Sequence, residues 1–208
     1  MSTSVVERED FEGIVRTAER IFSGFEDDLR VLTSCCRLLR NVCARSDEVR
    51  NSVAKKKLLL CGLIRMIRLA FRRRETVSLL VFIQTLGNCI TKSSRSFIWN
   101  AIFGLSEKRK KVLFCELCCS ECINMKALTR LSMILFLCVR AEGSHLKTFV
   151  QNRNLIHTWL RVFRSDDKNK KKIDTVEWVI FTVQEMILSE SVISQLILQI
   201  ESDTDDLA

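Results

Sequence analysis

Apolar residues recur every three or four positions through most of the chain, which is the spacing of amphipathic helices. Within Leu58–Phe71, positions 60, 63, 64, 67 and 71 are apolar, and the segment ends at three consecutive arginines. This pattern predicts a helix there and another that starts near Thr76. Further helices are expected over Glu7–Phe22, Ser93–Phe103, Lys111–Cys122, Met125–Val139, Leu146–Val150 with Ser144 as its N-cap, Leu155–Phe163, Val176–Leu188 and Ser191–Ile200.

One apolar helix pattern repeats along the chain at a constant spacing. Asn41 and Asn88 both follow Leu-x and precede two apolar residues, and they lie 47 positions apart. Two further steps of the same length lead to Leu135 and Thr182, and in all four copies the positions two before and one after are apolar. A period of about 40–47 residues is typical of armadillo and HEAT repeats. The sequence therefore predicts an all-α, armadillo-like right-handed solenoid of about four helical repeats, over residues 1–200 with an acidic tail at 201–208.

The composition agrees with a helical chain inside the cell. Proline is absent from the 208 residues and glycine occurs six times, which argues against a β-sandwich or barrel with many tight turns. The first eleven residues are rich in charge rather than apolar, and no apolar run is long and uncharged enough to span a bilayer. We therefore expect a soluble, cytoplasmic protein without a transmembrane segment, with its ten cysteines reduced.

The repeated motifs resemble the N-terminal armadillo region of the ataxin-10 family. The resemblance rests on Leu38–Cys43 with Arg50-Asn51-Ser52 soon after it, on Leu86–Cys89 followed by Phe97-Ile98-Trp99, on Ser132–Phe136 and on Glu177–Ile180. These matches occur in order over Leu32–Leu196. The resemblance implies a cytoplasmic armadillo scaffold without enzymatic activity, with roles in cell division and in neuronal survival and outgrowth through protein partners. Members of that family are about twice as long, and these 208 residues contain nothing similar to their second set of repeats.

Asn41 and Asn88 are the first candidates for a binding site. Asparagine is unfavourable inside a helix, so two at one repeat position need a reason. In armadillo proteins the third helix of each repeat lines a groove, where its asparagine can bond the backbone of an extended partner. The neighbours one turn away are Arg37, Arg45, Gln84 and Lys92, which would suit an acidic segment of a protein partner. The alternative is that each amide joins adjacent repeats by bonding a carbonyl of a loop.

The sequence gives little support for a catalytic site or a metal site. Cys115, Cys118, Cys119 and Cys122 have the spacing of zinc ligands, but a straight helix would separate the first and last by about 10.5 Å along its axis. Sulfurs that share one zinc lie within roughly 4 Å of each other, so a buried apolar stripe is the preferred interpretation. A cysteine nucleophile needs a neighbouring general base, and the sequence has only two histidines that could serve as one. We expect a protein that is not an enzyme and has no cofactor and no metal site.

Basic clusters give a second candidate surface and an alternative function. Lysine and arginine number 33 against 25 acidic residues, and part of the excess lies in the clusters Lys55–Lys57 and Lys168–Lys172. An adaptor that binds RNA or anionic membrane through such loops is the alternative, although the lack of tyrosine argues against base stacking. Trp99 is expected to pack between repeats or to anchor a partner, and an uncapped solenoid end could self-associate. The candidate basic surface consists of Arg72, Arg73, Arg74, Lys108, Arg109, Lys110 and Lys111.

Overall fold

The computed structural model describes residues 3–104, 112–118, 123–140, 143–152, 181–182 and 184. Every element in those ranges is an α-helix, which confirms the all-α prediction for this part of the chain. The expected helices at 155–163 and 191–200 and the acidic tail lie outside the described residues. The helices are α1 (Thr3–Gly24), α2 (Leu29–Arg45), α3 (Asp47–Lys55), α4 (Lys57–Arg72), α5 (Thr76–Asn88), α6 (Arg95–Ile102), α7 (Leu113–Cys118), α8 (Met125–Val139) and α9 (Gly143–Gln151).

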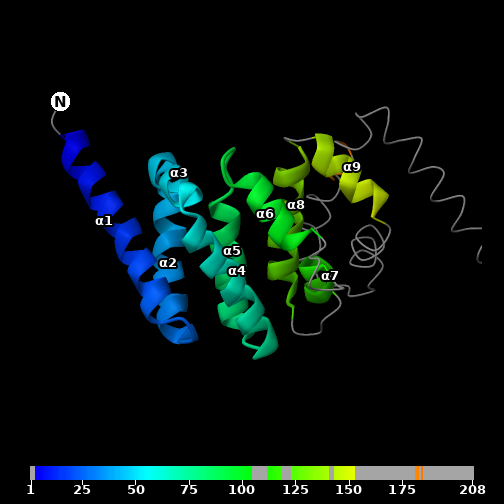
Figure 1. The fold of residues 1–208 in the computed structure, drawn as a ribbon, viewed down its shortest axis with the longest axis horizontal. Helices are drawn as coiled ribbons and strands as arrows, with labels where there is room; N and C mark the ends of the chain where they lie inside the picture. Colours follow the sequence, from blue (N-terminus) through cyan, green and yellow to red (C-terminus); the bar gives the residue numbers. More distant parts are fainter. Residues whose placement is uncertain are drawn as a thin grey trace, which may run out of the picture.

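The described helices pack in two layers (Figure 1). In one layer α2 packs along α5 and α5 along α8, although each is remote from the next in the sequence. In the other layer, which lies in front in Figure 1, α4 packs on α5 and α6 packs on α8. Helix α1 covers one end by packing on α2, α3 and α4. Consequently α2, α5 and α8 together present one face of the molecule.

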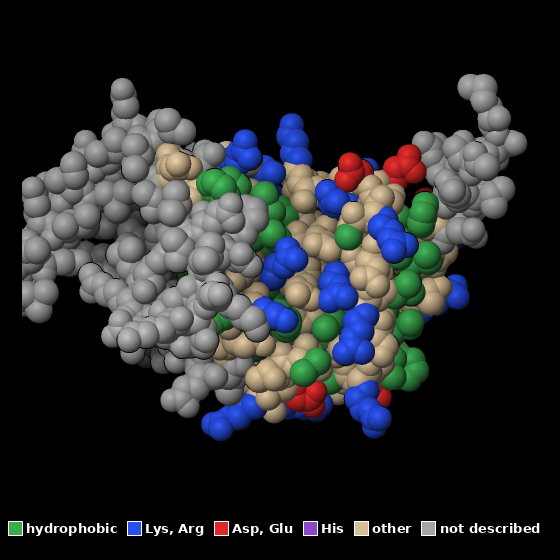
Figure 2. All heavy atoms as spheres, turned by 180° about the vertical axis from the view of Figure 1, so that it is seen from behind, with side chains coloured by type: hydrophobic (Ala, Val, Ile, Leu, Met, Phe, Trp, Pro, Cys, Tyr) green, Lys and Arg blue, Asp and Glu red, His purple; other side chains and the backbone are tan. Residues whose placement is uncertain are grey.

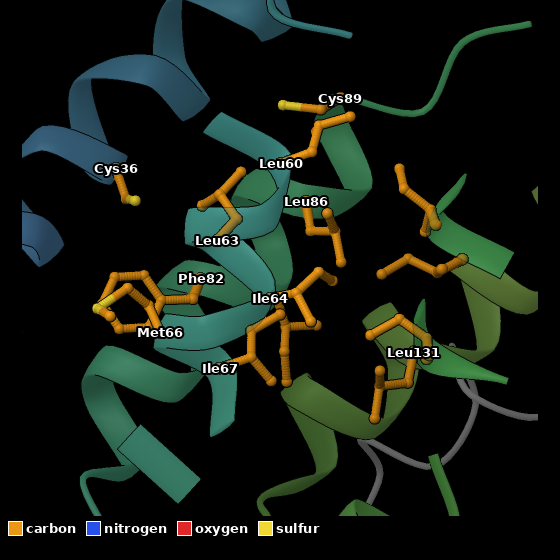
Figure 3. Close-up of a cluster of buried hydrophobic side chains, with 14 of the residues drawn as sticks. Cys36, Leu60, Leu63, Ile64, Met66, Ile67, Phe82, Leu86, Cys89 and Leu131 are labelled. Carbon is orange, nitrogen blue, oxygen red and sulfur yellow. The ribbon is translucent and has the colours of Figure 1, made fainter. Parts of the chain in front are cut away.

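The apolar core lies around α5, between the two layers (Figure 3). Leu63 and Ile67 of α4, Phe82 and Leu86 of α5 and Leu131 of α8 are all at most 1% exposed. Helix α5 has no charged residue and is buried around most of its circumference, because α2, α4 and α8 surround it. Burial of a large apolar side chain contributes about 1.5–3 kcal/mol, so this packing holds the three helices of the shared face in fixed positions.

Several helix boundaries follow the apolar pattern closely, and others depart from it. Helix α4 covers the predicted Leu58–Phe71, α5 begins at the predicted Thr76, and α8 has the predicted bounds. The pattern gave no range for α3, which begins after Ser46, whose hydroxyl accepts a hydrogen bond from the backbone N–H of Val49 at 3.3 Å. The cap predicted at Ser144 is wrong, because α9 already begins at Gly143.

The 47-residue period agrees with burial between α2 and α5 but not between α5 and α8. Leu39 and Leu86 are both fully buried, whereas Met133 at the next step is partly exposed. Leu135, the step that follows Asn41 and Asn88, is fully buried. A constant 47-residue step from the exposed stripe of α5 predicts where the exposed stripe of α8 should begin. The stripe of α8 instead begins at Lys126, which is two positions later in the sequence. Two residues correspond to a rotation of about 200° around a helix. The residue of α8 that matches Asn41 and Asn88 in the 47-residue repeat therefore lies on the buried side of α8 and not on its exposed stripe.

Helix α4 ends in a Schellman motif built without glycine. Arg74 has φ 57°, in the left-handed region, and its N–H donates to the carbonyl of Phe71 at 3.1 Å. The N–H of Glu75 donates to the carbonyl of Ala70 at 2.9 Å. These two bonds satisfy carbonyls at the helix end and turn the chain into α5. Glycine usually occupies the left-handed position, because other residues are strained there.

Candidate functional site

The face shared by α2, α5 and α8 is the first candidate site, and we call it the basic face. Its members recur every three or four positions on each helix, and the side chains are exposed or half-buried. On α2 the stripe is Arg30, Ser34, Arg37, Leu38, Asn41 and Arg45; on α5 it is Val77, Leu80, Gln84 and Asn88; on α8 it is Lys126, Thr129, Arg130, Met133 and Leu137.

The charge on this face has one sign. Helix α2 carries four arginines, α8 carries Lys126 and Arg130, and none of α2, α5 and α8 contains an aspartate or glutamate. Figure 2 shows the side of the molecule that lies at the back of Figure 1, where lysine and arginine side chains gather and acidic side chains lie near the edges. A face with uncompensated guanidinium groups attracts segments of negative charge.

Asn88 and its neighbours join α5 to α2. The side-chain amide of Asn88 donates to the backbone carbonyl of Arg40 at 3.0 Å. The Arg40 guanidinium donates in turn to the side-chain carbonyl of Gln84 at 2.6 Å. The buried hydroxyl of Thr85 lies 3.1 Å from the carbonyl of Cys36 and 2.8 Å from that of Val81. The Asn88 amide therefore joins α5 to α2, and the carbonyl that it bonds lies within helix α2 and not in a loop.

Asn41 occupies a different environment from Asn88, although the two share a repeat position. Its side chain is exposed, and its carbonyl accepts a hydrogen bond from the Arg40 guanidinium at 3.4 Å. Arg37 and Arg45 lie one turn away on the same exposed stripe, and Lys92 is exposed beyond the end of α5. Of the six residues in the predicted groove, these four remain accessible, while Gln84 and Asn88 are bound to α2.

Two apolar side chains on the basic face were missed by the sequence reasoning. Leu38 on α2 is 52% exposed and Val77 on α5 is 63% exposed. Leu38 lies in the α2 stripe of Arg37 and Asn41, so the helical spacing of the arginines could have identified it. Val77 lies on α5, which has no arginine, so only the packing of α5 beside α2 places it on this face. Exposed apolar residues inside a charged surface are suited to contact an apolar side chain of a partner.

The second candidate surface lies partly within the described residues. Arg72, Arg73 and Arg74 are exposed at the end of α4, and the Arg73 guanidinium donates to the backbone carbonyl of Asp27 at 3.1 Å. The remaining members, 108–111, and the cluster at 168–172 lie outside the described residues. Lys55–Lys57 spans the junction of α3 and α4, where the Lys56 ammonium lies 3.4 Å from the Glu19 carboxylate.

The cysteines of the predicted stripe are partly visible. Cys115 and Cys118 on α7 are half-buried and pack against the core, whereas 119 and 122 lie outside the described residues. Within the described part of the chain, no group of three histidine, cysteine or acidic residues is arranged to hold a metal ion.

A second group of cysteines lies between α2 and α5. Burial raises the pKa of the Cys35 thiol to about 11, and burial is also the main cause that raises the pKa of Cys36 well above its usual value. The hydrogen bond between Cys43 and Cys89 lowers the pKa of the first thiol and raises that of the second. All four side chains are at most 8% exposed, so they pack as small apolar residues.

Trp99 is buried between α6 and α9. Its ring stacks on Phe103 with a centroid distance of 5.0 Å and on His145 with a centroid distance of 4.7 Å. The Nδ1 atom of His145 lies 3.1 Å from the backbone carbonyl of Cys138. Trp99 is 3% exposed, so it packs against α9 inside the protein and is not accessible to a partner.

Comparisons with known proteins leave the chain without an assigned relative. No protein-family model matches it, and neither a curated protein nor a solved structure does. Among the described helices, none combines the length and the apolar character needed to cross a bilayer.

Proposed function

We propose that this chain is a non-catalytic protein-interaction scaffold of the armadillo type, which holds an acidic, extended segment of a partner protein along the basic face. The proposal includes the resemblance to the ataxin-10 family, with the cytoplasmic location and the roles in cell division and in neuronal survival and outgrowth that it implies. The observation that carries the binding part is the complete lack of acidic residues on α2, α5 and α8.

The order of the helices supports the armadillo part of the proposal. Helices α3, α4 and α5 are followed by α6, α7 and α8, and the last helix of each set contributes to the basic face. Helix α2 has the corresponding place before α3, 47 positions ahead of α5. Stacked units of this kind present a long continuous surface, which suits an extended partner.

The chemistry of the basic face favours an acidic partner with apolar residues. Arg37 and Arg45 are exposed, and guanidinium groups form paired hydrogen bonds with carboxylates. The exposed Asn41 amide can bond a backbone peptide group, which gives recognition of an extended chain. Leu38 and Val77 add apolar contact between the charges. Charge attraction contributes on-rate and specificity, and the apolar contacts contribute affinity.

Charge reversal on the basic face tests this function. Arg37→Glu with Arg45→Glu changes two exposed positions of α2, and Lys55→Glu with Lys57→Glu makes the same change of net charge on α3 and α4. Each protein is used as bait in nuclease-treated cytosol, and the captured proteins are identified by mass spectrometry. We expect acidic proteins to be lost from the α2 variant and retained by the α3–α4 variant, while circular dichroism shows equal helicity.

A labelled peptide with the sequence of the acidic segment of the captured partner is then prepared. The affinity of this peptide for the protein is measured over a series of salt concentrations. Because exposed charges are screened at a distance of about 10 Å in 0.1 M salt, affinity should fall as salt rises. An unchanged set of captured proteins in both variants would contradict binding on the basic face. Capture that disappears on nuclease treatment would favour the alternative adaptor for nucleic acid.

A further inference from the structure

The basic face consists of three bands that differ in charge, one on each of its helices. Helices α2, α5 and α8 lie side by side and run in the same direction (Figure 1). The exposed stripes of α2 and α8 contain arginine or lysine, and neither helix contains an acidic residue, whereas α5 has no charged residue at all. The order across the face is therefore basic, uncharged and basic. A segment that crosses the three helices meets positive charge at two separate places.

Contacts between the helices show which residues lie at the same height on the three bands. The side-chain amide of Asn88 on α5 bonds the backbone carbonyl of Arg40 on α2, 48 positions earlier in the sequence. On the other side of α5, Gly87 lies next to Met133 of α8, 46 positions later. Because the three helices run in the same direction, residues about 47 positions apart lie at about the same height.

Arg37 on α2, Gln84 on α5 and Arg130 on α8 follow one another at this step. Arg37 is exposed and Arg130 is half-buried, and among the described residues neither forms an ion pair. The Arg130 guanidinium donates to the sulfur of Met133 at 3.3 Å, which is a weak acceptor. Gln84 already accepts a hydrogen bond from Arg40. This height of the face therefore offers two guanidinium groups to carboxylates, with an uncharged helix between them.

The separation of the two guanidinium groups sets a spacing for the partner. Packed helices lie about 8–10 Å apart, so the two steps from α2 to α8 span about 16–20 Å. An extended chain advances about 3.3 Å per residue, so this span corresponds to about five to six residues. Side chains of an extended chain alternate between its two sides, so only an even spacing directs both acidic side chains to the protein. A spacing of six residues meets both conditions.

We propose that the partner segment carries two acidic residues six positions apart, which pair with Arg37 and Arg130 while the chain between them crosses α5. Each carboxylate can accept paired hydrogen bonds from one guanidinium. The partner residues two and four positions after the first acidic residue face α5, where uncharged side chains fit. This specificity rests on the proposed function, because it concerns the same face and the same class of partner.

The test uses the full chain and three labelled peptides of equal length and composition, each with two glutamates among uncharged residues and with blocked ends. The glutamates are five, six or seven positions apart, and fluorescence anisotropy measures the three dissociation constants. The peptide with a spacing of six should bind at least about threefold more tightly than the other two, because only this peptide completes both ion pairs.

Single substitutions locate the source of this preference. Arg37→Gln and Arg130→Gln should each reduce it to less than about 1.5-fold, because one glutamate then has no guanidinium partner. Arg45→Gln removes the same charge about two turns from Arg37 on α2, so it should weaken the three peptides by equal factors. Arg20→Gln, the same change at an exposed position of α1, should leave all three affinities unchanged. Circular dichroism confirms equal helicity of the four variants.

The possible failures separate this proposal from the proposed function. Equal affinity of the three peptides, with all three weakened by the double charge reversal at Arg37 and Arg45, would overturn the spacing and leave binding on the basic face intact. A preference for six that persists in Arg130→Gln would also overturn the spacing. If none of the three peptides binds, the spacing is overturned as well, and the capture experiment with the charge-reversal variants decides whether the basic face binds an acidic partner.

Discussion

The side-chain amide of Asn88 donates a hydrogen bond to the backbone carbonyl of Arg40, 3.0 Å away, and so joins α5 to α2. Asn41 has the same position in the repeat but no described helix offers its amide such a carbonyl, because α1 covers another side of α2 and leaves Asn41 exposed. The same residue type in the same motif therefore has a structural contact in one copy and an accessible side chain in the other.

This difference predicts unequal effects of two identical substitutions. Asn88→Ala removes the bond between α5 and α2 and should lower the free energy of unfolding by about 1 kcal/mol. Asn41→Ala removes an exposed amide and should change it by less than about 0.5 kcal/mol. Urea unfolding followed by circular dichroism measures both. Equal losses in the two variants would contradict the assignment of a structural role to Asn88 alone.

A second prediction concerns the effect of a substitution at Gly62 on the contact between α1 and α4. A Cβ atom at this position would lie 2.6 Å from the Cδ1 atom of the Phe22 ring, which is 5% exposed. Gly62→Ala should therefore force the ring to move and lower the free energy of unfolding by about 1–3 kcal/mol.

Gly13 offers a matched control for this substitution. It also lies inside a helix, but nothing lies within 4 Å of an added Cβ atom. Gly13→Ala should raise the free energy of unfolding by up to about 1 kcal/mol, because alanine favours the helix. Thermal unfolding of both variants measures the difference, and a stabilising Gly62→Ala would show that α1 does not pack on α4 as described.

Many helices of the fold were predictable because an amphipathic helix requires apolar residues every three or four positions in its own sequence. The bounds of α4, α5 and α8 follow from apolar spacing, since each helix buries one stripe. The rotation of α8 relative to a constant 47-residue step could not be predicted. It depends on how closely α8 approaches α5, where Gly87 lies next to Met133 and Ile134. Such a contact is a property of two helices together and is not visible in either one.

The candidate site was predictable to a similar degree. The sequence identified Arg37, Asn41 and Arg45 as neighbours on one face, because their spacing is helical. It could not decide between partner binding and repeat joining for Asn88, since that depends on the distance to Arg40 in another helix.

A third prediction concerns the pH dependence of stability. Burial raises the pKa of the Cys35 thiol from its ordinary value of 9.0 to about 11. Between these values the unfolded chain loses the proton and the folded chain keeps it, so the free energy of unfolding falls as pH rises. Below pH 9 both states hold the proton, and this contribution to the pH dependence disappears.

Cys35→Ala should therefore lose less stability than the unchanged protein between about pH 8 and about pH 11. Urea unfolding at several pH values measures the difference, and comparison at each pH cancels the titration of lysines common to both proteins. Cys61→Ala, which changes an exposed thiol, should give a pH profile parallel to that of the unchanged protein. If Cys35→Ala were also parallel, burial of the Cys35 thiol would be disproved.

The end of α4 gives the last prediction. Arg74 has φ 57°, and a left-handed conformation costs a residue with a Cβ atom about 1–2 kcal/mol. Arg74→Gly relieves this strain but adds freedom to the unfolded chain, so the free energy of unfolding should rise by about 0.5–1 kcal/mol. Arg73→Gly removes the same charge at a residue with φ −82°, where glycine brings only the entropic cost and the bond to Asp27 is lost. That variant should be destabilised, so opposite signs for adjacent arginines are expected in urea unfolding. A loss of stability in both variants would mean that α4 does not end with Arg74 in the left-handed position.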